Sequence, residues 1–211
     1  MTETPARTLP AVVDVAAHRP GVDRLLPLLG VAVGVLTSFA QGWLDSPWAA
    51  LANAASPWLV IAFAVGYRGR TAASAAVLGL VTCLGEVAGY YAAAAARGFG
   101  VSTGWVVFWL VCAVVGGPLF GACGRLVRVP RTWLAACAAA APAATFLGEG
   151  IGSYWLRLGY LAEAVLFVVL GLTAGALALV RTPARPTTVA AVAVGTLAAS
   201  ALYGVLLGSL G

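Results

Sequence analysis

A single carboxylate, Glu86, lies inside the apolar stretch VTCLGEVAGYYAAAAAR at residues 81–97. Tyr90 follows four residues later, so in a helix its phenol lies one turn away on the same face. An acid near the middle of a membrane span costs about 2.5–3.5 kcal/mol on insertion scales. It therefore faces the bundle interior or a wet cavity and is a candidate functional group. The competing interpretation is a protonated or hydroxyl-bonded Glu86 that serves helix packing alone.

Other polar and aromatic side chains gather toward the same predicted end of the helices. Glu149 lies in GEGIGSYW, residues 148–155, whose glycines and serine predict an opened helix end. We predict an outward-facing acidic and aromatic pocket with the ligand-binding residues Glu86, Tyr90, Glu149, Tyr154, Trp155, Tyr160, Glu163 and Asn53. The competing interpretation for Glu149 and Glu163 is a solvated position at the membrane surface. For the tryptophans it is an interfacial aromatic belt.

Three functions are compatible with such a pocket. Carboxylates beside tyrosine and tryptophan rings suit binding or transport of a small cationic or amphipathic molecule, with Glu86 as a proton-coupling acid. Alternatively, Glu86 is the general acid of a membrane-embedded isoprenoid (terpene) cyclase. In the third interpretation the acids are structural and the protein is a non-catalytic membrane assembly protein. Because no internal repeat is visible, a transporter of this size would form a homo-oligomer or work with a partner membrane subunit.

Several other chemistries find no support in the sequence. The only histidine, His18, lies in the N-terminal tail, so we expect no histidine-based metal site and no serine–histidine pair. We also expect no cofactor. All 12 basic side chains are arginines, scattered singly along an apolar chain, and we therefore expect no nucleic-acid partner.

The composition places these residues in a lipid bilayer. The 211 residues are 62% hydrophobic and only 9% charged, whereas a soluble domain carries about 25% charged residues. Apolar runs of about 18 or more residues are typical of membrane-spanning helices. We predict an all-α, multi-pass protein of a bacterial plasma membrane.

The apolar runs predict about seven helices in a single transmembrane domain, residues 23–211, after a disordered cytoplasmic tail at 1–22. A cleavable signal peptide is the alternative for the first run. The segment 41–58, with three tryptophans and two prolines, is too broken to span and predicts an interfacial or re-entrant loop. The predicted spans are 24–42, 57–68, 71–96, 103–124, 131–148, 156–180 and 187–209.

Arginine placement predicts the orientation of the helices. If the seven spans alternate, ten arginines fall at one end and only Arg97 and Arg157 at the other. Positively charged residues favour the cytoplasmic side. We therefore predict a cytoplasmic N-terminus and an external C-terminus.

Glycine spacing predicts close helix contacts. Pairs four residues apart occur at Gly30/Gly34, Gly85/Gly89, Gly117/Gly121 and Gly148/Gly152, and small residues at this spacing let helix backbones approach closely in membranes. Pro118 lies within the fourth span and predicts a kink there.

Several short stretches resemble those of a known family. LANAASPWLVIAFAVG (51–66), GYY (89–91), GGPLFG (116–121) and GEG (148–150) are similar to motifs of small actinobacterial multi-pass membrane proteins catalogued as a domain of unknown function. The resemblance covers most of residues 25–205. It implies a single-domain helical membrane protein and carries no activity.

Overall fold

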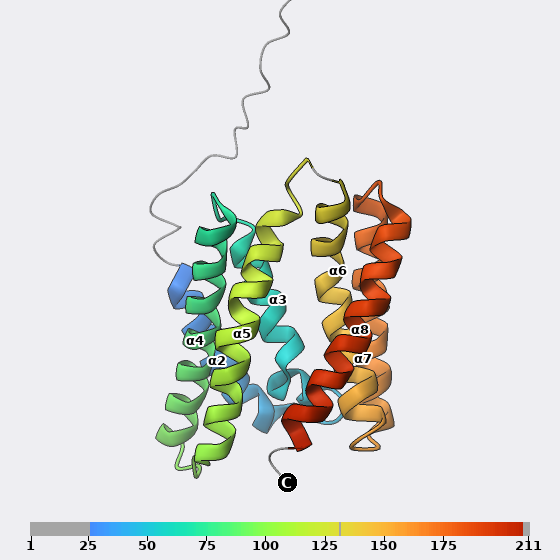
Figure 1. Ribbon diagram of the computed structural model, residues 1–211. Helices are drawn as coiled ribbons and strands as arrows, with labels where there is room; N and C mark the ends of the chain where they lie inside the picture. Colours follow the sequence, from blue (N-terminus) through green and yellow to red (C-terminus); the bar gives the residue numbers. More distant parts are fainter. Residues whose placement is uncertain (1–25, 131, 209–211) are drawn as a thin grey trace, which may run out of the picture.

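The computed structural model describes residues 26–130 and 132–208, and the regular elements in these ranges are all helical (Figure 1). The predicted tail at 1–22, Arg24 and Arg131 lie outside the described residues. In chain order the elements are α2 (Leu26–Trp43), the 3₁₀ helix η1 (Trp48–Asn53), α3 (Ala55–Gly66), α4 (Ala72–Ala96), α5 (Thr103–Leu126), α6 (Thr132–Glu149), the π-helix η2 (Gly150–Trp155), α7 (Leu161–Arg181) and α8 (Arg185–Gly208). The predicted all-helical bundle is confirmed.

The helices form two groups that lie side by side (Figure 1). In the first group α4 packs between α2 and α5, and α3 packs against α4 and α5. In the second group α6 packs against both α7 and α8. The groups meet where α6 contacts α3 and α5.

Within residues 26–130 and 132–208, five helical segments are long and apolar enough to cross a membrane: α4, α5, α6 with η2, α7 and α8. By contrast, α3 has 12 residues and is only about 18 Å long, less than the ~30 Å thickness of a hydrocarbon core. Large apolar side chains such as Val114, Leu172 and Val180 are exposed on the outside of the bundle, where lipid would cover them. The chain is a multi-pass helical membrane protein.

The described arginines gather at the two ends of the bundle as the sequence predicts. The α3–α4, α5–α6 and α7–α8 connections lie at one end (Figure 1), with Arg68, Arg70, Arg125, Arg128, Arg181 and Arg185 in or beside them. Arg97 and Arg157 lie at the opposite end, together with η1. Which end faces the cytoplasm stays a prediction.

Glycines bring the helix backbones of the first group into direct contact. A Cβ atom added at Gly34 of α2 would overlap the carbonyl oxygen of Glu86 on α4, and one at Gly79 of α4 would overlap the carbonyl oxygen of Gly117 on α5. Side chains at these positions would push the helices apart. The predicted close approach is therefore confirmed at these contacts.

The stretch 148–155 departs from a regular helix, but it stays helical. Beyond Glu149 the chain widens into the π-helix η2, in which the amide of Leu156 donates to the carbonyl of Ile151 at 2.9 Å. Gly159, with a φ of +70°, then reverses the chain before α7. The predicted sixth span, 156–180, is therefore wrong at its start, because the residues before Leu161 form this turn.

Candidate functional site

Glu86 is sealed inside the first helix group. Its side chain is fully buried, and neither carboxyl oxygen has an N–H or O–H partner among the described residues. The thiol of Cys83, a weak donor, lies beside it. The backbone carbonyl of Glu86 lies against the backbone of α2 at Gly34. An ionised carboxylate without partners in an apolar interior is very costly, so the neutral acid is the form that this site accommodates.

Glu149 is also buried, but it is fully bonded. Its Oε1 accepts the backbone N–H of Ala55 at 3.0 Å, and its Oε2 accepts the backbone N–H of Ser56 at 2.8 Å. The Ser56 hydroxyl donates to the same Oε2 at 2.5 Å. These two amides open α3, whose first residues are buried in the bundle. The carboxylate thus supplies the acceptors that an interior helix start lacks, and it lies at the positive end of the α3 dipole.

A chain of hydroxyl groups continues from Glu149 across the junction of the two helix groups. The Ser56 hydroxyl lies 3.3 Å from the Thr145 hydroxyl on α6, which lies 3.2 Å from the phenol oxygen of Tyr203 on α8. All four residues of this chain are buried. We call Glu149, Ser56, Thr145 and Tyr203 the hydroxyl chain.

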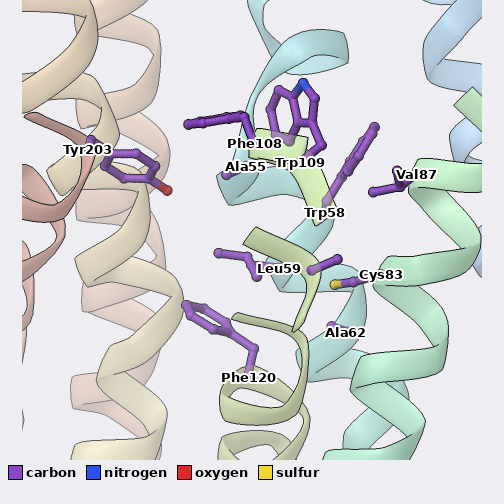
Figure 2. Packing of buried hydrophobic residues seen from close by; sticks show 11 residues of the cluster. Ala55, Trp58, Leu59, Ala62, Cys83, Val87, Phe108, Trp109, Phe120 and Tyr203 are labelled. Atoms are coloured by element: carbon purple, nitrogen blue, oxygen red, sulfur yellow. The ribbon is translucent and has the colours of Figure 1, made fainter. Parts of the chain in front are cut away.

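The hydroxyl chain ends at a cavity of about 380 Å³, which we call the lateral groove. Residues 111–120 of α5 and 191–203 of α8 form its two sides, and residues 137–145 of α6 with Ala55 and Leu59 complete it. Thr145 and Tyr203 supply its hydroxyl groups among otherwise apolar walls. Figure 2 shows the Tyr203 ring projecting toward Ala55, Leu59 and Phe120 with its hydroxyl foremost.

A second cavity, of about 540 Å³, lies at the end of the bundle that carries Arg97; we call it the Arg97 cavity. Its walls come from α2, η1, α4, the α4–α5 connection and the start of α5. Tyr90 and Asn53 of the predicted site line it, and the Tyr90 hydroxyl donates to Gln41.

A small void of about 10 Å³ lies beside both cavities. It shares Ala55, Leu59 and Cys112 with the lateral groove and Trp109 with the Arg97 cavity. The rings of Trp58 and Trp109, 5.1 Å apart, border this void. Trp109 thus lies between the void and the Arg97 cavity, whereas Trp58 borders the void alone.

The remaining predicted site residues lie elsewhere. Tyr154 is buried against Phe167, with ring centres 4.8 Å apart. Trp155 and Tyr160 are more than half exposed. Glu163 accepts a hydrogen bond of 2.6 Å from Ser46.

The three cavities described above do not include the predicted acids, and the binding role predicted for these acids stays a prediction. Glu86, Glu149 and Glu163 line none of the three cavities above. Among the residues that the structure describes, no group of three or more histidine, cysteine or acidic side chains is arranged to hold a metal ion.

Sequence reasoning did not single out the members of the hydroxyl chain other than Glu149. The available signal was the presence of Ser56, Thr145 and Tyr203 inside apolar runs. Such residues are common in membrane helices, where they bond to their own backbone or across helices. Arg97 was used only to predict orientation.

The fold defines the chain as a polytopic helical membrane protein. More specifically, it belongs to a family of unknown function, DUF6518, which it matches over residues 19–209. This confirms the resemblance to an uncharacterised family, while the actinobacterial origin stays a prediction. No curated protein and no solved structure matches the chain.

Proposed function

We propose that the protein binds a small amphipathic molecule drawn from the bilayer. Its apolar chain would lie in the lateral groove, and its polar end would contact Tyr203. The observation that carries this proposal is the junction of the apolar groove with the buried hydroxyl chain. A volume of about 380 Å³ also lies within the range of small-molecule sites, ~300–1,000 Å³.

The order of protons along the hydroxyl chain specifies the polar end of the ligand. Ser56 donates its hydroxyl proton to Glu149, so Thr145 must donate to Ser56. Tyr203 must in turn donate to Thr145, because each hydroxyl has one proton. The phenol oxygen of Tyr203 keeps its acceptor capacity toward the groove. A ligand that donates a hydrogen bond, a hydroxyl or an ammonium, fits this position.

The wall of the groove is compatible with a linear or isoprenoid chain. Small side chains such as Ala141, Ala144 and Ala198 leave the space open, and Leu119 and Leu202 at its rim are more than half exposed. In a bilayer such a rim would face lipid, so a membrane-dissolved molecule could enter sideways.

The test is equilibrium binding of radiolabelled decanol to the protein in phosphatidylcholine nanodiscs. Decanol and decylamine should compete, whereas methyl decyl ether should compete at least about tenfold more weakly, because loss of one hydrogen bond to a buried group costs about 1–3 kcal/mol. Tyr203→Phe should abolish this preference. Tyr154→Phe, a buried tyrosine away from the groove, should leave it unchanged. Equal competition by all three compounds would reject the proposal.

Transport of the ligand across the bilayer, coupled to a proton on Glu86, stays a prediction. The carboxyl group of Glu86 is fully buried and lines none of the three cavities, so proton exchange would require the helices around it to separate. The cyclase alternative likewise needs Glu86 to reach a substrate, and Glu86 lines none of the three cavities. Location in a bacterial plasma membrane and assembly with a second copy or a partner subunit also stay predictions.

A further inference from the structure

The Arg97 cavity has a charge opposite to that of the predicted acidic pocket. Arg97 is the charged residue among its lining side chains, which include no Asp or Glu. Neutral polar groups of Gln41, Asn53 and Ser102 face the same space. Rings of Tyr91, Trp105 and Trp109 supply flat apolar walls.

The guanidinium of Arg97 is held in place by its neighbours. It lies over the rings of Phe39 and Phe99, 4.6 and 4.8 Å from their centres. One nitrogen, Nη1, donates to the backbone carbonyl of Ser38 and, at 3.4 Å, to the Ser38 hydroxyl. An arginine fixed in this way loses little further conformational freedom when it binds a ligand.

Part of this guanidinium is available to a ligand. Its Nε and Nη2 groups make no hydrogen bond with a described residue, and no carboxylate in the described part of the chain lies within ion-pair distance of Arg97. The Nε and Nη2 groups together form one edge of the guanidinium, which can donate two parallel hydrogen bonds to carboxylate or phosphate oxygens. At the edge of a low-dielectric bundle, a half-buried cation without a counter-charge attracts an anion more strongly than one in water.

We propose that the Arg97 cavity binds a small organic anion, with a carboxylate or phosphate group on Arg97 and a planar apolar body against Trp105 and Trp109. This site is separate from the lateral groove and prefers the opposite ligand charge. If this second proposal fails, the result expected for decanol in the lateral groove is unaffected. The anion could come from two sources, a free aromatic anion or the headgroup of an anionic lipid, which share the same recognition by Arg97.

The test uses phenyl phosphate, benzoate, benzyl alcohol and benzylamine as probes in phosphatidylcholine nanodiscs. Trp105 and Trp109 line the cavity, so binding should change their fluorescence. We expect saturable binding of the two anions, at least about tenfold weaker binding of the alcohol, and none of the amine. Arg97→Gln should lower affinity for the anions at least about tenfold.

Arg157→Gln is the matched control. Arg157 lies at the same end and donates to the carbonyl of Gly204, but it does not line the cavity, so this variant should bind like the wild type. If Arg97→Gln does not fold, Arg97→Lys tests the same point: it keeps the charge but loses the fork and should bind the anions several-fold more weakly.

A second measurement identifies the source of the anion. This measurement is native mass spectrometry of the protein from nanodiscs that contain phosphatidylglycerol. If the headgroup is the ligand, the wild type should retain phosphatidylglycerol and Arg97→Gln should lose it. If phenyl phosphate binds and phosphatidylglycerol is not retained, the ligand is a free anion. Equal binding of anions, alcohol and amine, or anion binding that is unchanged in Arg97→Gln and Arg97→Lys, would overturn the proposal.

Discussion

Glu149 and Ser56 are 93 residues apart in the chain, and their side chains are joined by a 2.5 Å hydrogen bond deep in the bundle. The same carboxylate binds the backbone amides of Ala55 and Ser56. This contact links the start of α3 to the end of α6 and so joins the two helix groups. It also fixes the direction of the hydrogen bonds that reach the lateral groove.

Replacing Glu149 should strongly destabilise the protein. Glu149→Met would leave two buried N–H groups and a hydroxyl without their acceptor, and each unsatisfied group costs about 1–3 kcal/mol. We expect the free energy of unfolding, measured by titration with SDS in mixed micelles, to fall by about 3 kcal/mol or more. Glu163→Met is the control: it removes one hydrogen bond to Ser46 and should cost about 1 kcal/mol. A loss for Glu149→Met no larger than the control would refute the capping role.

The same substitution at Glu86 should have the opposite effect. Among the described residues Glu86 has no N–H or O–H partner to lose, only the weak thiol donor of Cys83. Replacing such a poorly compensated buried polar group by an apolar one of similar size is neutral or stabilising. We expect Glu86→Met to unfold at the same or a higher SDS fraction than the wild type. A loss of more than about 1 kcal/mol would show that Glu86 has a bonded partner in solution.

The close contact of α2 with α4 should depend on Gly34. A methyl group there would overlap the Glu86 carbonyl oxygen, so Gly34→Ala forces the helices apart and should cost about 1–3 kcal/mol. Gly204→Ala is a matched control, because a Cβ at Gly204 meets nothing within 4 Å. Alanine has a greater helix propensity than glycine, so Gly204→Ala should leave the free energy of unfolding unchanged or raise it slightly. Both are measured by the same SDS titration, and equal effects would contradict the packing described for α2.

The position of Trp109 between the small void and the Arg97 cavity predicts a change in cysteine reactivity. Cys83 borders the small void and is 2% exposed. In a protein whose other cysteines are replaced by alanine, a small methanethiosulfonate reagent should label Cys83 slowly. Trp109→Leu should open the void toward the Arg97 cavity and speed the labelling at least about tenfold, because thiol reactivity requires access. Trp105→Leu removes a cavity ring that does not border the void and should leave the rate unchanged. Equal rates in both variants would show that Trp109 does not separate the void from the Arg97 cavity.

The helices of this fold could be predicted from the sequence because a lipid bilayer imposes a simple requirement on any chain that spans it. Backbone groups in hydrocarbon must bond within their own helix, so apolar runs between arginines mark the spans. The close contacts at Gly34 and Gly117 were predictable for a related reason, since only small residues let backbones approach.

The candidate site was much less predictable. Burial of Glu86 follows from its position in an apolar run, but whether its carboxyl group faces a cavity depends on how the neighbouring helices pack around it. Glu149 resembled a surface acid because GEGIGSYW suggested a frayed end, whereas the π-helix keeps it inside. The partnership of Glu149 with Ser56, Thr145 and Tyr203 joins three separate helices, and no local spacing encodes it.

The most direct test of the account is the position of a bound alcohol. A decanol analogue with a diazirine next to its hydroxyl group should, on irradiation in nanodiscs, label α6 and α8 near Thr145 and Tyr203, and excess decanol should suppress this labelling. The account would be contradicted if labelling were insensitive to decanol and spread over the exposed outer side chains of α7, such as Leu172 and Val180.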